Sequence, residues 1–198
     1  MNSLFDVLNN RYLVISVMGP HAGESEKEIF GRKIEDIMRV GKTFWLNRSQ
    51  KARPDMVQRL CKEARKAEED CYCIFIEPSA KGGAIPATTD ASAKMYSEDG
   101  TIWHDLPSKL SPVTGKIGSG AQALVFDQLQ LADVLCFVNL WNYADFVYQD
   151  LPLKIILGVS TVCAVRKDMH SHKDRIISNR RRIIAVGRIC HPSCVYLK

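Results

Sequence analysis

The chain has 198 residues, of which 46% are hydrophobic and 25% charged, and its formal net charge is +5 at pH 7. This composition is ordinary for a globular protein, and the chain has no internal repeat or low-complexity tract. No apolar run reaches the length of a membrane span, and residues 1–11 lack the basic and apolar regions of a secretory signal. We therefore expect one cytoplasmic domain over residues 1–198 that does not enter a membrane.

The first half of the chain alternates strand and helix patterns. Residues 12–18 form a near-continuous apolar run, which is typical of a strand buried on both faces. Ser25 and Glu28 have the spacing of a capping box and begin a helix that ends near Gly41. The alternation continues with a strand, a helix that begins with proline and a buried strand: residues 42–46, the helix from Pro54, and residues 71–76.

The second half begins with a long irregular segment. Residues 79–118 show no sustained periodicity, which indicates a long binding loop or lid, with a hairpin predicted around Asp99-Gly100. Helical spacing then predicts a helix that starts at Ser119 and includes Leu129. Four strands are predicted after it, with a turn at Pro192-Ser193: residues 132–140, 154–165, 181–190 and 194–197.

This order of elements favours a particular α/β fold. Strands that alternate with helices are typical of parallel sheets with right-handed crossovers. We therefore predict a Rossmann-like three-layer α/β/α fold with a mainly parallel sheet and antiparallel C-terminal edge strands. Residues 166–198 hold nine Lys and Arg against two Asp, so this extension of the sheet is basic.

Basic and small residues follow the ends of the predicted strands. In parallel sheets, ligands bind beyond the carboxyl ends of the strands. Helix N-termini and basic side chains that meet at this edge favour phosphate or carboxylate groups. The predicted ligand-binding residues are Gly19, Gly23, Glu24, Ser25, Arg48, Ser49, Lys51, Arg53 and Asn139. The predicted ligand is a nucleotide or another phosphorylated small molecule, and the alternative is that these loops are basic only because they are solvated.

Two residues at this predicted edge are candidates for general acid or base catalysis. Glu77 ends the third buried strand, and His21 lies in the loop after the first. The reaction that they would support is hydrolysis or group transfer, with residues 79–118 as a lid. The alternative is that Glu77 is a solvent-facing strand end and His21 a structural loop residue. No cofactor motif is present, because both the dinucleotide glycine fingerprint and the P-loop lysine are missing.

The basic C-terminal segment supports other hypotheses. Arginines in it can contact the phosphates of nucleic acid, or can protect an edge strand from aggregation; they are Arg180, Arg181 and Arg182. Nitrogen and sulfur ligands for zinc are also present, at His170, His172, Cys190 and Cys194. Their spacing matches no standard zinc motif, so we predict no metal. Pairing of the last strands across a two-fold axis would make a homo-oligomer, which we expect.

Two stretches carry a resemblance to known proteins. One is ISVMGPHAGESEKEIFGRKIEDIMRVGKTFWL, from Ile15, and the other is FDQLQLADVLCFVNL, from Phe126. Together they resemble the Rossmann-like nucleoside deoxyribosyltransferase and nucleotide N-glycosidase families, and the resemblance implies a Rossmann-like fold that acts on nucleosides or nucleotides. Those families place a glutamate near a glycine after the second stretch, whereas NYADFVYQDLP has neither. The resemblance therefore supplies no catalytic carboxylate, and a binding protein without that chemistry is equally compatible.

Overall fold

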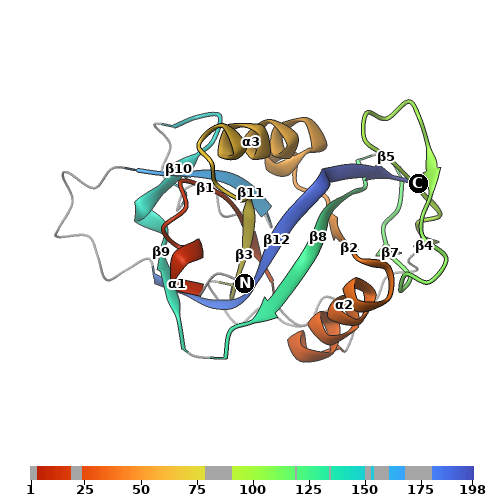
Figure 1. Cartoon of the computed structure of the whole chain (residues 1–198), viewed down its shortest axis with the longest axis horizontal. Helices are drawn as coiled ribbons and strands as arrows, with labels where there is room; N and C mark the ends of the chain where they lie inside the picture. The colour runs from red at the N-terminus through yellow and green to blue at the C-terminus, as the bar shows by residue number, and fades with distance from the viewer. Residues whose placement is uncertain are drawn as a thin grey trace.

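The computed structural model describes residues 4–18, 24–78, 91–118, 120–133, 135–149, 153, 161–167 and 180–198. Within these ranges the chain forms a mixed ten-stranded sheet, a separate two-stranded sheet, and helices that pack against the larger sheet. In Figure 1 the last strand, drawn in blue, curves through the middle of the molecule and joins its two halves. None of the helices in the described ranges is long and apolar enough to cross a membrane.

The elements predicted for the first half of the chain are confirmed. After a short helix α1 (Leu4–Val7), they are β1 (Tyr12–Val17), α2 (Glu26–Val40), β2 (Thr43–Asn47), α3 (Pro54–Lys66) and β3 (Tyr72–Ile76). A 3-10 helix that was not predicted, η1 (Gln50–Ala52), lies between β2 and α3. The capping box of α2 forms as predicted: the Glu28 backbone N–H donates to Ser25 Oγ, and the Ser25 N–H donates to Glu28 Oε2. Gly41 ends α2 at a φ of 79°, which glycine adopts without strain.

The predicted Rossmann-like fold is wrong. Among the strand pairs of the described residues, β1 with β3 is the single parallel pair, and all the others are antiparallel. β2 does not lie beside β1 but pairs with β8 (Gln122–Leu131). Both long helices also pack on the same face of the sheet, where α2 contributes Phe30 and α3 contributes Leu60 to one apolar cluster. A three-layer fold would place helices on both faces.

The helix predicted from Ser119 is also wrong, because residues 122–131 form β8. Residues 122–126 are all buried, and successive side chains point alternately into two different apolar clusters. Leu124 and Phe126 join the cluster under α2 and α3, while Ala123 and Val125 join a different one. A strand buried on both faces has no polar alternation, so its apolar run also fits a helical spacing.

The C-terminal strands are not edge strands. A single long strand, β12 (Arg180–Leu197), replaces the two predicted ones and pairs with β3 on one side and β8 on the other. The turn predicted at Pro192-Ser193 is instead an irregularity inside β12, between the pairs that Ile189 and Cys194 make with β8. β12 also pairs with β9 (Phe137–Asn139) and with β5 (Met95–Ser97).

The other elements are short. The strand predicted over 132–140 is reduced to β9, and the one predicted over 154–165 appears as β11 (Thr161–Arg166), with residues 154–160 outside the described ranges. The predicted hairpin around Asp99-Gly100 is confirmed, since β5 pairs with β6 (His104–Asp105). The remaining elements are β4 (Ala91–Ser92), β7 (Thr114–Gly115), η2 (Leu140–Asn142) and β10 (Tyr143–Asp145).

Three apolar clusters hold the fold together. Along β1, Val14 faces the cluster under α2 and α3, whereas Leu13 and Ile15 face a second cluster that includes Val7 of α1. The third cluster lies in the other half of the molecule and includes Val113, so the part of the predicted lid that the structure describes contributes to the core. Residues 79–90 of the predicted lid lie outside the described ranges.

Candidate functional site

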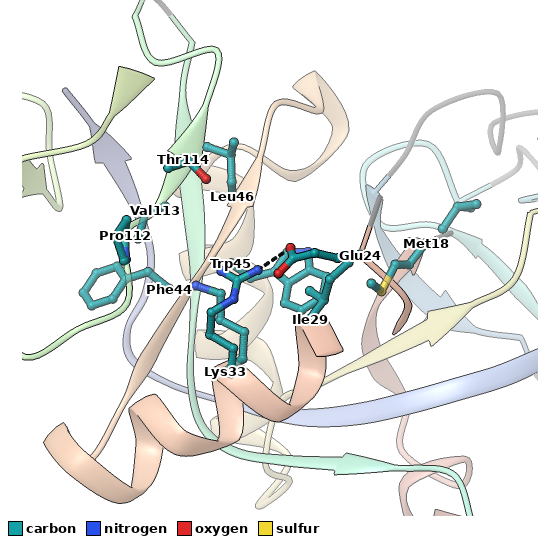
Figure 2. A pocket seen from close by; sticks show the side chains of 12 residues that line it. Met18, Glu24, Ile29, Lys33, Phe44, Trp45, Leu46, Pro112, Val113 and Thr114 are labelled. Carbon is teal, nitrogen blue, oxygen red and sulfur yellow. Dashed lines mark hydrogen bonds and ion pairs between the residues drawn. The ribbon is translucent and has the colours of Figure 1, made fainter. Parts of the chain in front are cut away.

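A cavity of about 250 Å³ lies between the start of α2, the strand β2 and residues 112–114. We call it the α2–β2 pocket (Figure 2). Most of its wall is apolar, from Val17, Met18, Ile29, Phe44, Trp45, Leu46, Pro112 and Val113. Three charged side chains also line it, and all come from α2 or the residues just before it: Glu24, Arg32 and Lys33. The pocket therefore combines an apolar wall with a small charged cluster, which is the usual composition of a small-molecule site.

Lys33 is the most unusual residue of this pocket. It belongs to the buried face of α2, together with Ile29 and Phe30, and only 6% of its surface is exposed. Burial removes water from the ammonium group and lowers the pKa of Lys33 to about 8, although the charge of Asp36 partly opposes this shift. A buried lysine is costly to a fold, so its position in a cavity wall is the strongest sign of a functional site in this part of the molecule.

Asp36 anchors the walls of the pocket. It is fully buried, and its Oδ1 accepts hydrogen bonds from the Ser111 backbone N–H at 2.8 Å and from Arg39 Nη2 at 3.0 Å. Its Oδ2 accepts from Thr43 Oγ1 at 3.0 Å. Burial by itself raises the pKa of Asp36, but the hydrogen bonds from Ser111 and Thr43 and the charge of Lys33 outweigh it and hold the pKa below its usual value. One carboxylate thus connects α2, β2 and the segment that leads into residues 112–114.

The mouth of the pocket carries an ion pair. Arg32 Nη2 lies 2.6 Å from Glu24 Oε2, and both side chains are partly exposed. In Figure 2 the dashed line at Glu24 marks this pair. Trp45 is fixed in place by two other rings: it stacks on Phe30 with centroids 5.0 Å apart and packs against Phe75 at 4.5 Å. The aromatic part of the wall is therefore preorganised.

Of the residues predicted for the first loop, Glu24 lines the pocket and Ser25 caps α2. Gly19, His21 and Gly23 lie outside the described residues. The prediction of a site at the end of β1 and the start of α2 thus coincides with the position of the α2–β2 pocket, although sequence reasoning did not identify Arg32, Lys33 or Trp45. One signal pointed to Lys33: together with Asp36, it interrupts the apolar stripe of α2.

The residues predicted for the second loop do not line this pocket. Each makes a contact elsewhere in the protein: Arg48 Nη1 donates to the Lys116 carbonyl, the buried Ser49 Oγ donates to the Thr161 carbonyl, Lys51 lies 4.8 Å from the Tyr148 ring centre, and Arg53 pairs with Asp55 at 3.0 Å. The physical reason is the sheet order. β2 pairs with β8 rather than standing beside β1, and the segment after β2 packs against β11, where Ser49 meets Thr161, instead of lining the pocket.

Glu77 and Asn139 also lie away from the pocket lining. Glu77 Oε2 lies 3.6 Å from Arg182 Nε, and the Asn139 side chain caps η2 by accepting from the Trp141 N–H. Arg182 is also 3.9 Å from Glu26 Oε2, while Arg180 lies over the Phe137 ring. The role of Glu77 in catalysis and that of Arg180, Arg181 and Arg182 in nucleic-acid binding stay predictions.

The possible zinc ligands fall into two groups. Cys190 and Cys194 both lie on β12, where Cys194 is fully buried, while His170 and His172 lie outside the described residues. Within the described ranges, no group of three or more His, Cys, Asp or Glu side chains is placed to hold a metal ion.

The buried charge of Lys33 makes a testable contribution to stability. Because the pKa of Lys33 is about 8 in the folded chain and about 10.4 in an unfolded one, the unfolded state binds more protons between these values, so stability rises with pH there. We expect Lys33→Met to be more stable than the parent protein at pH 7, by at most about 3 kcal/mol. This advantage should shrink towards pH 10, as urea unfolding at several pH values will show. A constant difference would mean that Lys33 titrates as an ordinary lysine.

Comparison of this chain with protein-family models, with curated proteins and with solved structures finds no match. The resemblance to nucleoside deoxyribosyltransferases and nucleotide N-glycosidases therefore stays a prediction that these comparisons do not test.

Proposed function

We propose that the protein binds a small anionic molecule, phosphorylated or carboxylated, in the α2–β2 pocket. The observation that carries this proposal is the pair of cationic side chains, Arg32 and Lys33, on the wall of a mainly apolar cavity. Charges in surroundings poor in water interact strongly with an opposite charge. An anion in the pocket would compensate the buried ammonium of Lys33, which is why binding there is favourable.

The charges around the pocket support an anion rather than a cation. Lys33 and Arg32 contribute two positive charges and Glu24 one negative charge. Behind the wall, Asp36 pairs with Arg39 at 3.0 Å and with Lys33 at 3.8 Å, and the charges of Asp36 and Arg39 cancel in the sum. The sum is one positive charge, so a ligand with one or two negative charges is matched best.

The size and the wall of the pocket narrow the ligand further. A volume of about 250 Å³ lies slightly below the range typical of sites for drug-sized ligands, so a compound of metabolite size fits better than a large cofactor. Trp45 and Phe44 line the cavity and favour a ligand with a planar or apolar part beside its anionic group. A phosphorylated small molecule, which the sequence also predicts, has these properties.

Titration calorimetry at low salt tests this proposal, with inorganic phosphate, ribose 5-phosphate, adenosine monophosphate and 2-oxoglutarate as probes. Arg32→Gln removes a charged hydrogen-bond donor and should weaken binding of the best probe by about tenfold or more. Lys27→Met is the matched control, because it removes one positive charge from the exposed face of the same helix. It should change the affinity by less than about twofold.

Two results would contradict the proposal. One is the absence of binding by any probe to the folded parent protein. The other is an equal loss of affinity in Arg32→Gln and Lys27→Met, which would show that net charge rather than the pocket attracts the anion.

A further inference from the structure

We propose that the Lys33 amine is a nucleophile that forms an imine with a carbonyl-bearing anion bound in the α2–β2 pocket. This inference rests on the proposed function and adds to it the substrate class, an aldehyde or ketone that also carries a phosphate or carboxylate. Three features of the pocket support it: the Lys33 amine lies in the cavity wall, Asp36 has other hydrogen-bond partners, and Arg32 is placed to hold the anionic group.

The Lys33 amine is not held by a close hydrogen bond to its neighbour Asp36. A lysine buried only for structural reasons is expected to hydrogen-bond closely to a carboxylate. Lys33 Nζ instead lies 3.8 Å from Asp36 Oδ2, which is beyond hydrogen-bond length. The Asp36 carboxylate already accepts closer hydrogen bonds from Ser111, Arg39 and Thr43. Asp36 therefore does not depend on Lys33 for its hydrogen bonds.

Part of the Lys33 population is neutral near pH 7, because burial lowers the pKa of its ammonium group. Only the neutral form of an amine attacks a carbonyl, and desolvated lysines are the ones that enzymes use for this purpose. With a pKa of about 8, roughly a tenth of Lys33 is neutral at pH 7, whereas a lysine with the usual pKa of about 10.4 is less than about 0.1% neutral. The position in the cavity wall thus provides a usable fraction of nucleophile near neutral pH.

Other side chains of the pocket can hold the remaining parts of the ligand. Arg32 lines the same cavity and directly precedes Lys33 in α2, so it can hold the phosphate or carboxylate while Lys33 meets the carbonyl group. Apolar side chains of the wall, among them Ile29 and Phe44, line the same cavity and can receive the apolar part of the ligand beside its carbonyl group. Glu24 Oε2, already 2.6 Å from Arg32 Nη2, lies at the mouth and can accept or return the protons that the reaction moves.

The reaction is balanced without any metal or redox partner. The lone pair of neutral Lys33 Nζ attacks the carbonyl carbon, and one proton passes from the nitrogen to the carbonyl oxygen, through solvent or Glu24, to give a carbinolamine. The hydroxyl group of the carbinolamine then takes up a proton and leaves as water, while the nitrogen gives up its second proton to solvent or Glu24. The products are one imine and one water molecule.

Reductive trapping tests this inference, with pyridoxal 5′-phosphate as the carbonyl probe and sodium borohydride as the reductant. Borohydride delivers hydride to the imine carbon and leaves a stable secondary amine, which peptide mass spectrometry locates. At low probe concentration and pH 7.5, we expect Lys33 to be labelled at least about tenfold more than exposed Lys27 and Lys62. Labelling of Lys33 should rise with a midpoint near pH 8, because the neutral amine is the reactive form.

Two variants separate charge from nucleophilicity. Lys33→Arg keeps a positive charge but has no reactive amine, so it should bind pyridoxine 5′-phosphate, which lacks the carbonyl, and lose the trapped product. Arg32→Gln should weaken binding of both compounds. Circular dichroism of each variant confirms that it folds.

The outcomes distinguish this inference from the proposed function. If pyridoxine 5′-phosphate binds the parent protein but borohydride traps no product on Lys33, or labels the exposed lysines equally, the imine is excluded and anion binding stands. If Lys33 is trapped but the carbonyl-free analogue does not bind, the nucleophile stands and the anion site is wrong. If Lys33 is not trapped and pyridoxine 5′-phosphate does not bind, both the imine and the anion site are overturned.

Discussion

Asp36→Asn should lower the free energy of unfolding by about 3 kcal/mol, because it removes the charge from a buried and fully hydrogen-bonded carboxylate. The asparagine amide keeps one acceptor oxygen and turns the other position into a donor. That donor would face either the Ser111 N–H and Arg39 or the Thr43 hydroxyl, all of which donate to Asp36 in the parent protein. On the Thr43 side it would also approach the Lys33 ammonium, which lies 3.8 Å from Asp36 Oδ2. Urea unfolding at pH 7 measures the loss.

The matched control is Glu63→Gln, which removes the charge from an exposed carboxylate that pairs with Lys66 at 2.8 Å. Exposed pairs on helices contribute little, so this change should cost much less stability than Asp36→Asn. Equal losses in the two variants would show that the Asp36 network does not hold the pocket walls together.

The effect of Asp36→Asn should also depend on pH. The pKa of Asp36 is lowered in the folded state, so its contribution to stability is fully present above the unfolded pKa of about 3.9 and is lost as the pH falls through the folded pKa. The difference between the parent protein and the variant should therefore shrink in acid.

Asp36→Asn should also affect ligand binding. With Ser111 released from Asp36, the wall at residues 112–114 loses its anchor, and ligand binding should weaken together with stability.

The second large effect is expected in the core where β12 lies between β3 and β8. Gly187 pairs with Cys73 on one side and Leu129 on the other. A Cβ atom at this position would lie 2.7 Å from Leu129 Cδ2 and 2.8 Å from Phe126 Cδ1, which is closer than carbon atoms approach. We expect Gly187→Ala to cost about 1–3 kcal/mol, because the surrounding core must shift to admit one methyl group.

Gly31→Ala serves as the control with the opposite sign. Gly31 lies inside α2, and a Cβ atom there would meet nothing within 4 Å. The alanine should stabilise the protein by about 0.5–1 kcal/mol, because it reduces the conformational freedom of the unfolded chain and favours the helix. Thermal or urea unfolding of the two variants checks both signs, and a neutral or stabilising Gly187→Ala would mean that the close packing of β12 is relaxed in solution.

Local signals in the sequence were enough wherever an element is specified by its own residues. The capping box of Ser25 and Glu28 and the glycine at residue 41 bound α2, since hydrogen bonds and backbone angles within a few residues decide where a helix begins and ends. The apolar runs of β1 and β3 identified buried strands for the same reason. The prediction of a ligand site near Glu24 rests on the same elements, and Glu24 lines the α2–β2 pocket.

Pairing between distant segments was decided by the tertiary structure alone. The apolar run of β8 fits a helix or a doubly buried strand equally well, and only its place between β2 and β12 makes it a strand. The same pairing moves β2 away from β1, which separates Arg48 and Arg53 from the pocket and leaves Arg32, Lys33 and Trp45 to line it. Contacts between residues far apart in the sequence depend on the packing of whole faces, and a strand buried on both sides carries no polar stripe that would reveal its partners beforehand.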